Sequence, residues 1–223
     1  MLQAIGEVLP LAVGIAISPI PIIAAILMLL SPRARSTGVG FLVGWVVGIL
    51  VAVVVFSLLS GLIPAADPDA SQPIVGVIEI VLGVLLLLLA LRQWRSRPRA
   101  GETAALPKWM DAIDDMTAAR GLVLGFLLAA INPKNLLLAA SAGVTIGTAG
   151  LSVGSAVVVI AVFTLIAAIS VLVPVVGYLV AASAFRGPLN ALRGWLVDHN
   201  AAVMSVLLLV IGVAVIGKGI AAF

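Results

Sequence analysis

The sequence has no cysteine among its 223 residues and one histidine, His199. Without thiols the chain has no disulfide, no thiolate metal site and no thiol redox chemistry. A metal site needs several ligands, and a single histidine cannot supply them. We therefore predict a protein with neither a bound metal nor a cofactor.

Charged residues are also scarce. They make up 9% of the chain, against 63% hydrophobic residues, and the mean hydropathy is +1.34. A soluble domain of this size carries roughly 25% charged residues. Such a chain cannot cover itself with a polar surface, so we predict an integral membrane protein. Its formal net charge of +3 then bears on orientation in the membrane, and no nucleic-acid partner is expected.

Six apolar segments reach the roughly 20 residues that a bilayer-spanning helix needs. They cover residues 4–30, 38–63, 73–94, 120–146, 150–182 and 200–221. The fifth is too long for one upright span, so we expect it to tilt or to break near Pro174. We predict an all-α, polytopic fold with a three-helix repeat over 1–94, a cytoplasmic connector over 95–119 and a second three-helix repeat over 120–223.

Basic residues lie almost entirely in the odd-numbered loops of this arrangement. Ten of the twelve fall there: Arg33, Arg35, Arg92, Arg95, Arg97, Arg99, Lys108, Arg120, Arg186 and Arg193. Loops rich in Lys and Arg stay on the cytoplasmic side. We therefore expect a multi-pass protein of the cytoplasmic (inner) membrane with both termini outside. Within the connector, apolar residues recur at helical spacing over 106–117, which predicts an amphipathic helix lying on the inner leaflet.

Two proline motifs relate the two halves of the chain. Residues 17–22 read Ile-Ser-Pro-Ile-Pro-Ile, and residues 131–136 read Ile-Asn-Pro-Lys-Asn-Leu. Three spans per half is an odd number, so the two halves enter the membrane from opposite sides. This predicts an inverted repeat, a common plan of secondary transporters.

Each motif predicts a spanning helix that stops and restarts. Proline removes a backbone hydrogen bond and pushes the preceding residue out of the α region. Ser18 and Asn132 are favoured N-cap residues, and proline suits the first helical position that follows. Non-helical backbone inside a bilayer must be satisfied by protein or by water. We therefore expect the two breaks, in the first and fourth spans, to face each other or a cavity, where their positive helix ends would attract an anion.

Lys134 lies beside the second break, near the middle of the bilayer. A central lysine costs about 2.5–3.5 kcal/mol on an insertion scale. A ligand anion, a carboxylate partner or a change of protonation would each compensate. A bland alternative is that the prolines only kink the helices. The predicted substrate-binding residues are Ser18, Pro19, Pro21, Asn132, Pro133, Lys134 and Asn135.

Three charged residues fall within a turn or two of the predicted outer face. Glu7, Glu79 and Lys218 form either a structural ion pair or an ion- or proton-coupling site in which Glu79 relays protons. A series of glycines has, in part, the spacing that marks close helix packing: Gly14, Gly40, Gly44 and Gly48.

These spans and motifs resemble the lysine-exporter (LysE) superfamily. The Ser-Pro-Ile-Pro and Asn-Pro-Lys-Asn forms look most like its GAP branch, the sulfolipid- and glycopeptidolipid-addressing protein (Sap) family. By this resemblance, Ser18, Pro19 and Pro21 match the first family motif, and 132–135 match the second. The resemblance implies export of a small metabolite or delivery of a cell-envelope glycolipid. Amino-acid exporters of the superfamily have glycine where this chain has Ile20, which argues against an amino-acid substrate.

Several functions remain open at this point. The first is an exporter or flippase-like transporter of a small or lipid-linked anionic substrate, driven by an ion gradient or a partner. The second is a non-transporting accessory or scaffold protein of a lipid-export machinery, and an amino-acid or metabolite exporter is a further alternative. An intramembrane enzyme is not expected, since no Ser/His/Asp set, paired carboxylates or metal cluster occurs at a suitable depth. Expected partners are membrane lipid, the anionic or glycolipid substrate, and a second copy of the chain or an export complex.

Overall fold

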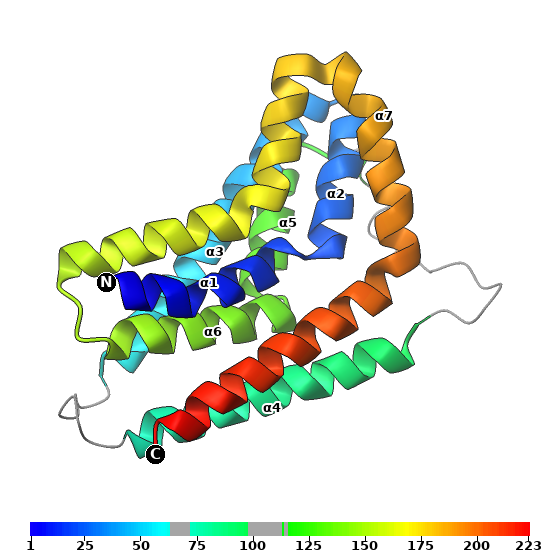
Figure 1. Cartoon of the computed structure of the whole chain (residues 1–223). Helices are drawn as coiled ribbons and strands as arrows, with labels where there is room; N and C mark the ends of the chain where they lie inside the picture. Colours follow the sequence, from blue (N-terminus) through cyan, green and yellow to red (C-terminus); the bar gives the residue numbers. More distant parts are fainter. Residues whose placement is uncertain (63–71, 98–112, 114–115) are drawn as a thin grey trace.

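The computed structural model describes residues 1–62, 72–97, 113 and 116–223. Over these residues the ordered elements are helices, which confirms the all-α class (Figure 1). The helices are α1 (Leu2–Ala16), α2 (Pro19–Leu30), α3 (Ala34–Ser60), α4 (Pro73–Arg95), α5 (Ala118–Ala130), α6 (Pro133–Thr148) and α7 (Val153–Ala221). Most of the connector lies outside the described residues, and with it most of the predicted amphipathic helix.

Both predicted helix breaks are present. The first span divides into α1 and α2, which meet at a bend of 53°, and the fourth divides into α5 and α6 at a bend of 61°. In each case the second helix begins at the predicted proline, Pro19 or Pro133. Proline has no N–H to continue the preceding helix, but its fixed φ suits a first helical turn.

The predicted fifth and sixth spans form one element of 69 residues, α7. Its backbone leaves the helical region at Ala181 (φ −142°, ψ 61°), where the chain folds back on itself (Figure 1). The predicted break near Pro174 is therefore wrong, since Pro174 lies inside the helix. Across the reversal, the Phe185 ring packs against Gly177, where there is no room for a Cβ.

By length and composition, three helices are able to cross a membrane: α3, α4 and α7. The number rises to five if each bent pair counts as one span. Large apolar side chains are exposed along α3, α4 and α7, as expected of helices that contact lipid.

Close backbone packing joins α3 to α5. Gly40, Gly44 and Gly48 of α3 lie against the backbone of α5, and a Cβ on any of them would clash with it. Gly121 and Gly125 of α5 lie in the same way against α3. The predicted close packing of these α3 glycines is confirmed, because small residues let two backbones approach.

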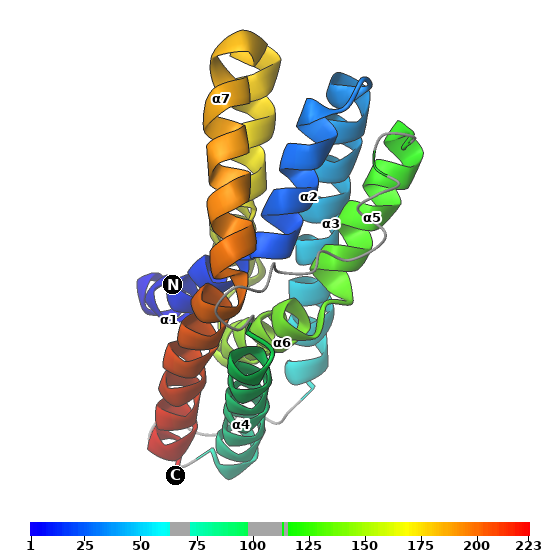
Figure 2. The ribbon, with the colours of Figure 1, turned by 90° about the vertical axis from the view of Figure 1, so that its right-hand side faces the viewer.

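A second glycine contact joins α4 to the C-terminal arm of α7, the part that follows the reversal. Gly76 faces Gly219, and Gly83 faces Gly212, each near the carbonyl oxygen of the other. Gln72 N also donates to Ala222 O at 2.7 Å. Figure 2 shows α4 beside this arm in the lower half of the molecule, with α2, α3 and α5 side by side above. The two chain termini lie at the same end as the start of α4 (Figure 1).

Candidate functional site

The two helix breaks meet in the middle of the structure. Ser18 and Asn135 are both buried, and Ser18 Oγ lies 3.3 Å from Asn135 Oδ1. Ser18 Oγ also lies 2.6 Å from the carbonyl oxygen of Ile15. Because a hydroxyl has one proton, it donates to one of these acceptors at a time. The shorter of the two contacts is with the carbonyl oxygen of Ile15 in α1.

Lys134 joins the same contact from α6 and is only 4% exposed. Its ammonium group donates to the carbonyl oxygens of Gly14 (2.6 Å) and Ile17 (3.2 Å), and to Ser18 Oγ. An ammonium has three donors, so all three are used. We call Ser18, Lys134 and Asn135 the break cluster.

These contacts explain how a lysine is tolerated at this depth. The last carbonyls of a helix have no intrahelical partner, and they form the negative end of its dipole. Lys134 satisfies two such carbonyls at the end of α1. The backbone of the other broken span therefore compensates part of the cost of burying Lys134, while compensation by a ligand, a carboxylate or a change of protonation stays a prediction.

The two predicted N-caps behave differently. Asn132 Oδ1 accepts a hydrogen bond from Lys134 N at 3.1 Å, and so caps α6 as predicted. Ser18 occupies the N-cap position of α2 in an extended conformation, but its side chain makes no capping hydrogen bond. The predicted N-cap position of Ser18 is therefore confirmed, whereas its hydroxyl contacts Lys134 and α1 and does not cap α2. Asn135 Nδ2 bridges the other break by donating to Leu128 O at 2.9 Å.

A cavity of about 420 Å³ adjoins the break cluster, and we call it the inner cavity. Six of the seven predicted substrate-binding residues line it: Ser18, Pro19, Pro21, Asn132, Pro133 and Lys134. Asn135 is not among the lining residues and contacts Ser18 from α6. Their role in binding a substrate remains a prediction.

Sequence reasoning missed the residues that α4 and α7 contribute to this cavity. Arg92 and Gln93 reach it from the end of α4, and Asn200 from α7. Asn200 Oδ1 is buried without a hydrogen-bond partner among the described residues. Arg92 carried a visible signal, its charge, but in sequence it was read only as evidence of membrane orientation. Asn200 had no signal, because an amide at the end of a span is ordinary.

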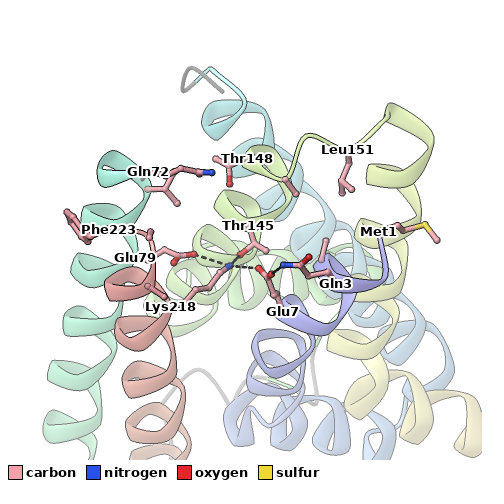
Figure 3. A pocket seen from close by; sticks show the side chains of 15 residues that line it. Met1, Gln3, Glu7, Gln72, Glu79, Thr145, Thr148, Leu151, Lys218 and Phe223 are labelled. Carbon is pink, nitrogen blue, oxygen red and sulfur yellow. Dashed lines mark hydrogen bonds and ion pairs between the residues drawn. The ribbon is translucent and has the colours of Figure 1, made fainter. Parts of the chain in front are cut away.

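A larger cavity of about 690 Å³ opens near the two termini, and we call it the outer cavity (Figure 3). Glu7, Glu79 and Lys218 line it together with Thr145. Lys218 Nζ lies 2.9 Å from Glu7 Oε2 and 3.1 Å from Glu79 Oε1. It also donates to Thr145 Oγ1 at 2.6 Å. The predicted ion pair is therefore present, and it contains two carboxylates on one ammonium.

Comparison with known proteins places the chain in a family. No curated protein and no solved structure matches it. The family model described as "Sap, sulfolipid-1-addressing protein" matches residues 8–221. This range includes both helix breaks and the parts of α4 and α7 that line the two cavities. Since the match covers nearly all of its length, the chain belongs to the Sap, sulfolipid-1-addressing protein, family.

Proposed function

We propose that this protein is a transporter that exports an anionic, lipid-linked substrate, such as a sulfated cell-envelope glycolipid, across the cytoplasmic membrane. Membership of the Sap family ties the chain to sulfolipid export as a membrane protein. The step from export in general to transport by this chain rests on the inner cavity.

The charge of the inner cavity carries the proposal. Its described lining includes two basic side chains, Arg92 and Lys134, and no carboxylate. The N-terminal ends of α2 and α6 also open onto it, and such ends attract anions. A sulfate or other anionic headgroup fits this balance, whereas a cation does not.

Few backbone donors are free at these two helix ends. Pro19 and Pro21 have no N–H, which leaves Ile20 as the one donor among the first three residues of α2. At α6, Pro133 has no N–H, and that of Lys134 is already bonded to Asn132. We infer that the site attracts an anion mainly through the charges of its basic side chains, and only weakly through backbone N–H groups. Arg92 would then be the direct ligand of the anion.

The rest of the lining suits an amphiphile. Ile20, Leu89, Met204 and Leu208 give the inner cavity an apolar wall beside its basic side chains. A lipid-linked anion has both parts, whereas an amino acid or a small polar metabolite lacks the apolar one. This favours a lipid-linked substrate over the metabolite-exporter alternative.

We propose that the chain has six spans arranged as an inverted repeat. We count the two arms of α7, before and after Ala181, as separate spans, and each bent helix pair as one. Each half of the chain then begins with a bent helix pair, as in the inverted repeats of secondary transporters. The resemblance to the lysine-exporter superfamily supports the same plan.

The test is lipid movement in vesicles that contain the purified protein. The probe is a trace of fluorescent sulfated glycolipid, and a chemical quencher outside reports how much of it has crossed. We expect faster crossing than in protein-free vesicles, and a loss of at least tenfold in Arg92→Gln. Arg186→Gln, an exposed arginine of α7 outside the inner cavity, is the matched control. Wild-type rates in both Arg92→Gln and Lys134→Ala would remove the site from the proposal.

The alternative is an accessory protein that supports a separate lipid exporter through its cytoplasmic connector. Ile113 of the connector is buried against the helices, so a connector variant must keep it. Replacing 98–112 with a neutral linker should abolish glycolipid delivery in cells if the chain is a scaffold. A transporter should still move the fluorescent glycolipid in vesicles after the same replacement.

A further inference from the structure

The charges of the three ionisable side chains in the outer cavity do not sum to zero. Glu7 and Glu79 share the single ammonium of Lys218, so the fully ionised group has one negative charge in excess. Glu79 is 1% exposed, and an uncompensated charge is costly at such a site. We call these three residues the outer triad.

Glu79 also has an unused acceptor. Its Oε1 lies 3.1 Å from Lys218 Nζ but makes no hydrogen bond. An ammonium has three donors, so Lys218 has one for each of Glu7, Glu79 and Thr145, but among the described residues the contact with Glu79 Oε1 lacks the geometry of a hydrogen bond. Glu7 is better satisfied, since Gln3 Nε2 donates to its Oε1 at 3.0 Å. Of the two carboxylates, Glu79 is therefore the more deeply buried one and the one with fewer hydrogen bonds among the described residues.

Every charged side chain that the described structure places on the outer cavity belongs to the triad. Glu7 comes from α1, Glu79 from α4 and Lys218 from α7, while α6 contributes the neutral Thr145. Met1 and Phe223, which hold the terminal charges, lie at opposite sides of the cavity (Figure 3). The remaining lining is neutral.

The outer triad and the break cluster are held by the same two helices. On α1, Glu7, Leu11 and Gly14 follow one another at helical spacing, and Gly14 contacts Lys134, as does Ser18 in the break beyond the end of the helix. On α6, Lys134, Leu138, Ser141 and Thr145 repeat the same spacing. Each helix thus contacts the break cluster at one end and Lys218 at the other, and at about 1.5 Å per residue the two contacts are about 10 Å apart along α1 and about 16 Å apart along α6.

We propose that the outer cavity is a proton-coupling site, in which Glu79 accepts one proton from the outer side and thereby loosens the outer end of the transporter. The inference rests on the proposed transport function. The proton passes from hydronium to a carboxylate oxygen of Glu79, leaving water and a neutral carboxyl group, and no other bond forms or breaks. Lys218 stays charged and keeps Glu7 and Thr145 as partners. The ion pair between Glu79 of α4 and Lys218 of α7 is lost, so Lys218 keeps two of the three partners that hold it in the cavity.

A metal cation fits this site less well than a proton. The ammonium of Lys218 already occupies the position between the two carboxylates. A sodium ion would need several oxygen ligands at once and would lie beside that positive charge. A proton on Glu79 needs no ligand shell and removes the excess negative charge.

The absence of cysteine allows a direct test with single-cysteine reporters. Ser141 is buried, its hydroxyl has no hydrogen-bond partner, and it lies one turn deeper than Thr145 on the same face of α6. The reporter Ser141→Cys therefore reacts with an impermeant thiol reagent only when the path past the triad opens. The control reporter Val153→Cys is at the exposed start of α7 and follows the thiol's own pH dependence.

The measurement is the ratio of the two labelling rates in nanodiscs, between mildly alkaline and mildly acidic buffer. We expect the ratio to rise several-fold on acidification, and Glu79→Gln to hold it at the high value throughout. A ratio that does not change with pH, or that changes equally in Glu79→Gln, would overturn the inference. Adding sodium chloride in place of acid should have no effect, and a sodium-dependent ratio would overturn the choice of a proton.

An infrared measurement covers the case in which Ser141→Cys does not fold. The difference spectrum between the two buffers should contain a protonated-carboxyl band that is missing in Glu79→Gln, and its presence in that variant would contradict the proposal. The outcomes also separate the two proposals. Glycolipid transport with pH-independent labelling defeats only the coupling site, whereas pH-dependent labelling without glycolipid transport defeats only the transport function.

Discussion

Lys134 Nζ donates a hydrogen bond of 2.6 Å to the carbonyl oxygen of Gly14, a residue 120 positions earlier in the chain. This contact joins the end of α1 to the start of α6. It places the positive charge of one broken span on the negative helix end of the other. Each break therefore depends on the other for its polar partners.

Replacing Lys134 should destabilise the fold. Lys134→Met leaves the buried carbonyl of Gly14, the partly buried carbonyl of Ile17 and the Ser18 hydroxyl without their donor. Each unsatisfied buried group costs about 1–3 kcal/mol, so we expect a loss of about 3 kcal/mol or more. Thermal unfolding in detergent measures it, with Arg186→Met as an exposed control. Equal melting temperatures for the two variants would contradict this account.

Asn132 should make a modest contribution to the free energy of unfolding, and another capping residue should be able to replace it. Its side chain caps α6 through Lys134 N, and loss of an N-cap costs about 1 kcal/mol. Asn132→Ala should lower the unfolding free energy by that amount, and Asn132→Ser should restore most of it. If Asn132→Ser is as unstable as Asn132→Ala, the side chain acts in some other way than as a cap.

The glycine contact between α3 and α5 should tolerate no side chain. A Cβ at Gly44 would clash with the backbone at Leu122 and Phe126, and overpacking of this kind costs about 1–3 kcal/mol. We expect Gly44→Ala to reduce the melting temperature and the yield of folded protein. Gly217→Ala is the matched control, because a Cβ there meets nothing.

Replacing Lys218 alone should destabilise the protein more than replacing both Lys218 and its buried partner Glu79. Lys218→Met leaves Glu79 buried without its ion partner, and we expect a cost below the about 3–5 kcal/mol of a fully buried pair, because the Lys218 side chain is 34% exposed and partly screened by solvent. The double variant Lys218→Met with Glu79→Leu removes both charges, so it should be more stable than Lys218→Met alone. A double-mutant cycle by thermal unfolding measures the coupling. Additive effects would mean that the two residues do not interact.

The membrane orientation can be tested with two further cysteine reporters. Leu62→Cys follows the end of α3 and Arg97→Cys follows the end of α4, and both positions are exposed. The excess of basic residues in the odd loops predicts that Arg97 faces the cytoplasm. In intact cells an impermeant thiol reagent should therefore label Leu62→Cys and spare Arg97→Cys until the cells are opened. The reverse pattern would invert the topology.

Much of the candidate site was predictable because proline acts locally. The missing N–H and the steric effect of Pro19 and Pro133 operate within one helical turn, whatever the tertiary structure. The depth of Lys134 also follows from counting residues along its span. These features required only the immediate neighbours in the sequence.

The partners of these residues could not be predicted, because they depend on how distant helices pack. Nothing near Lys134 indicates that its ammonium reaches Gly14, and nothing near Arg92 indicates that it shares a cavity with Pro19. The reversal of α7 shows the same limit. Pro174 is the visible helix breaker, yet the chain turns at Ala181, and the contact between Gly177 and the Phe185 ring forms only across that turn.

The glycine contacts between α4 and the C-terminal arm of α7 have a mechanical consequence. The pair touches the outer cavity through Glu79 and Lys218, and the inner cavity through Arg92 and Asn200. Gly83 and Gly212 meet between these two ends. Because the two backbones touch at that crossing, a tilt of α4 would carry the C-terminal arm of α7 with it and would move a wall of each cavity at the same time.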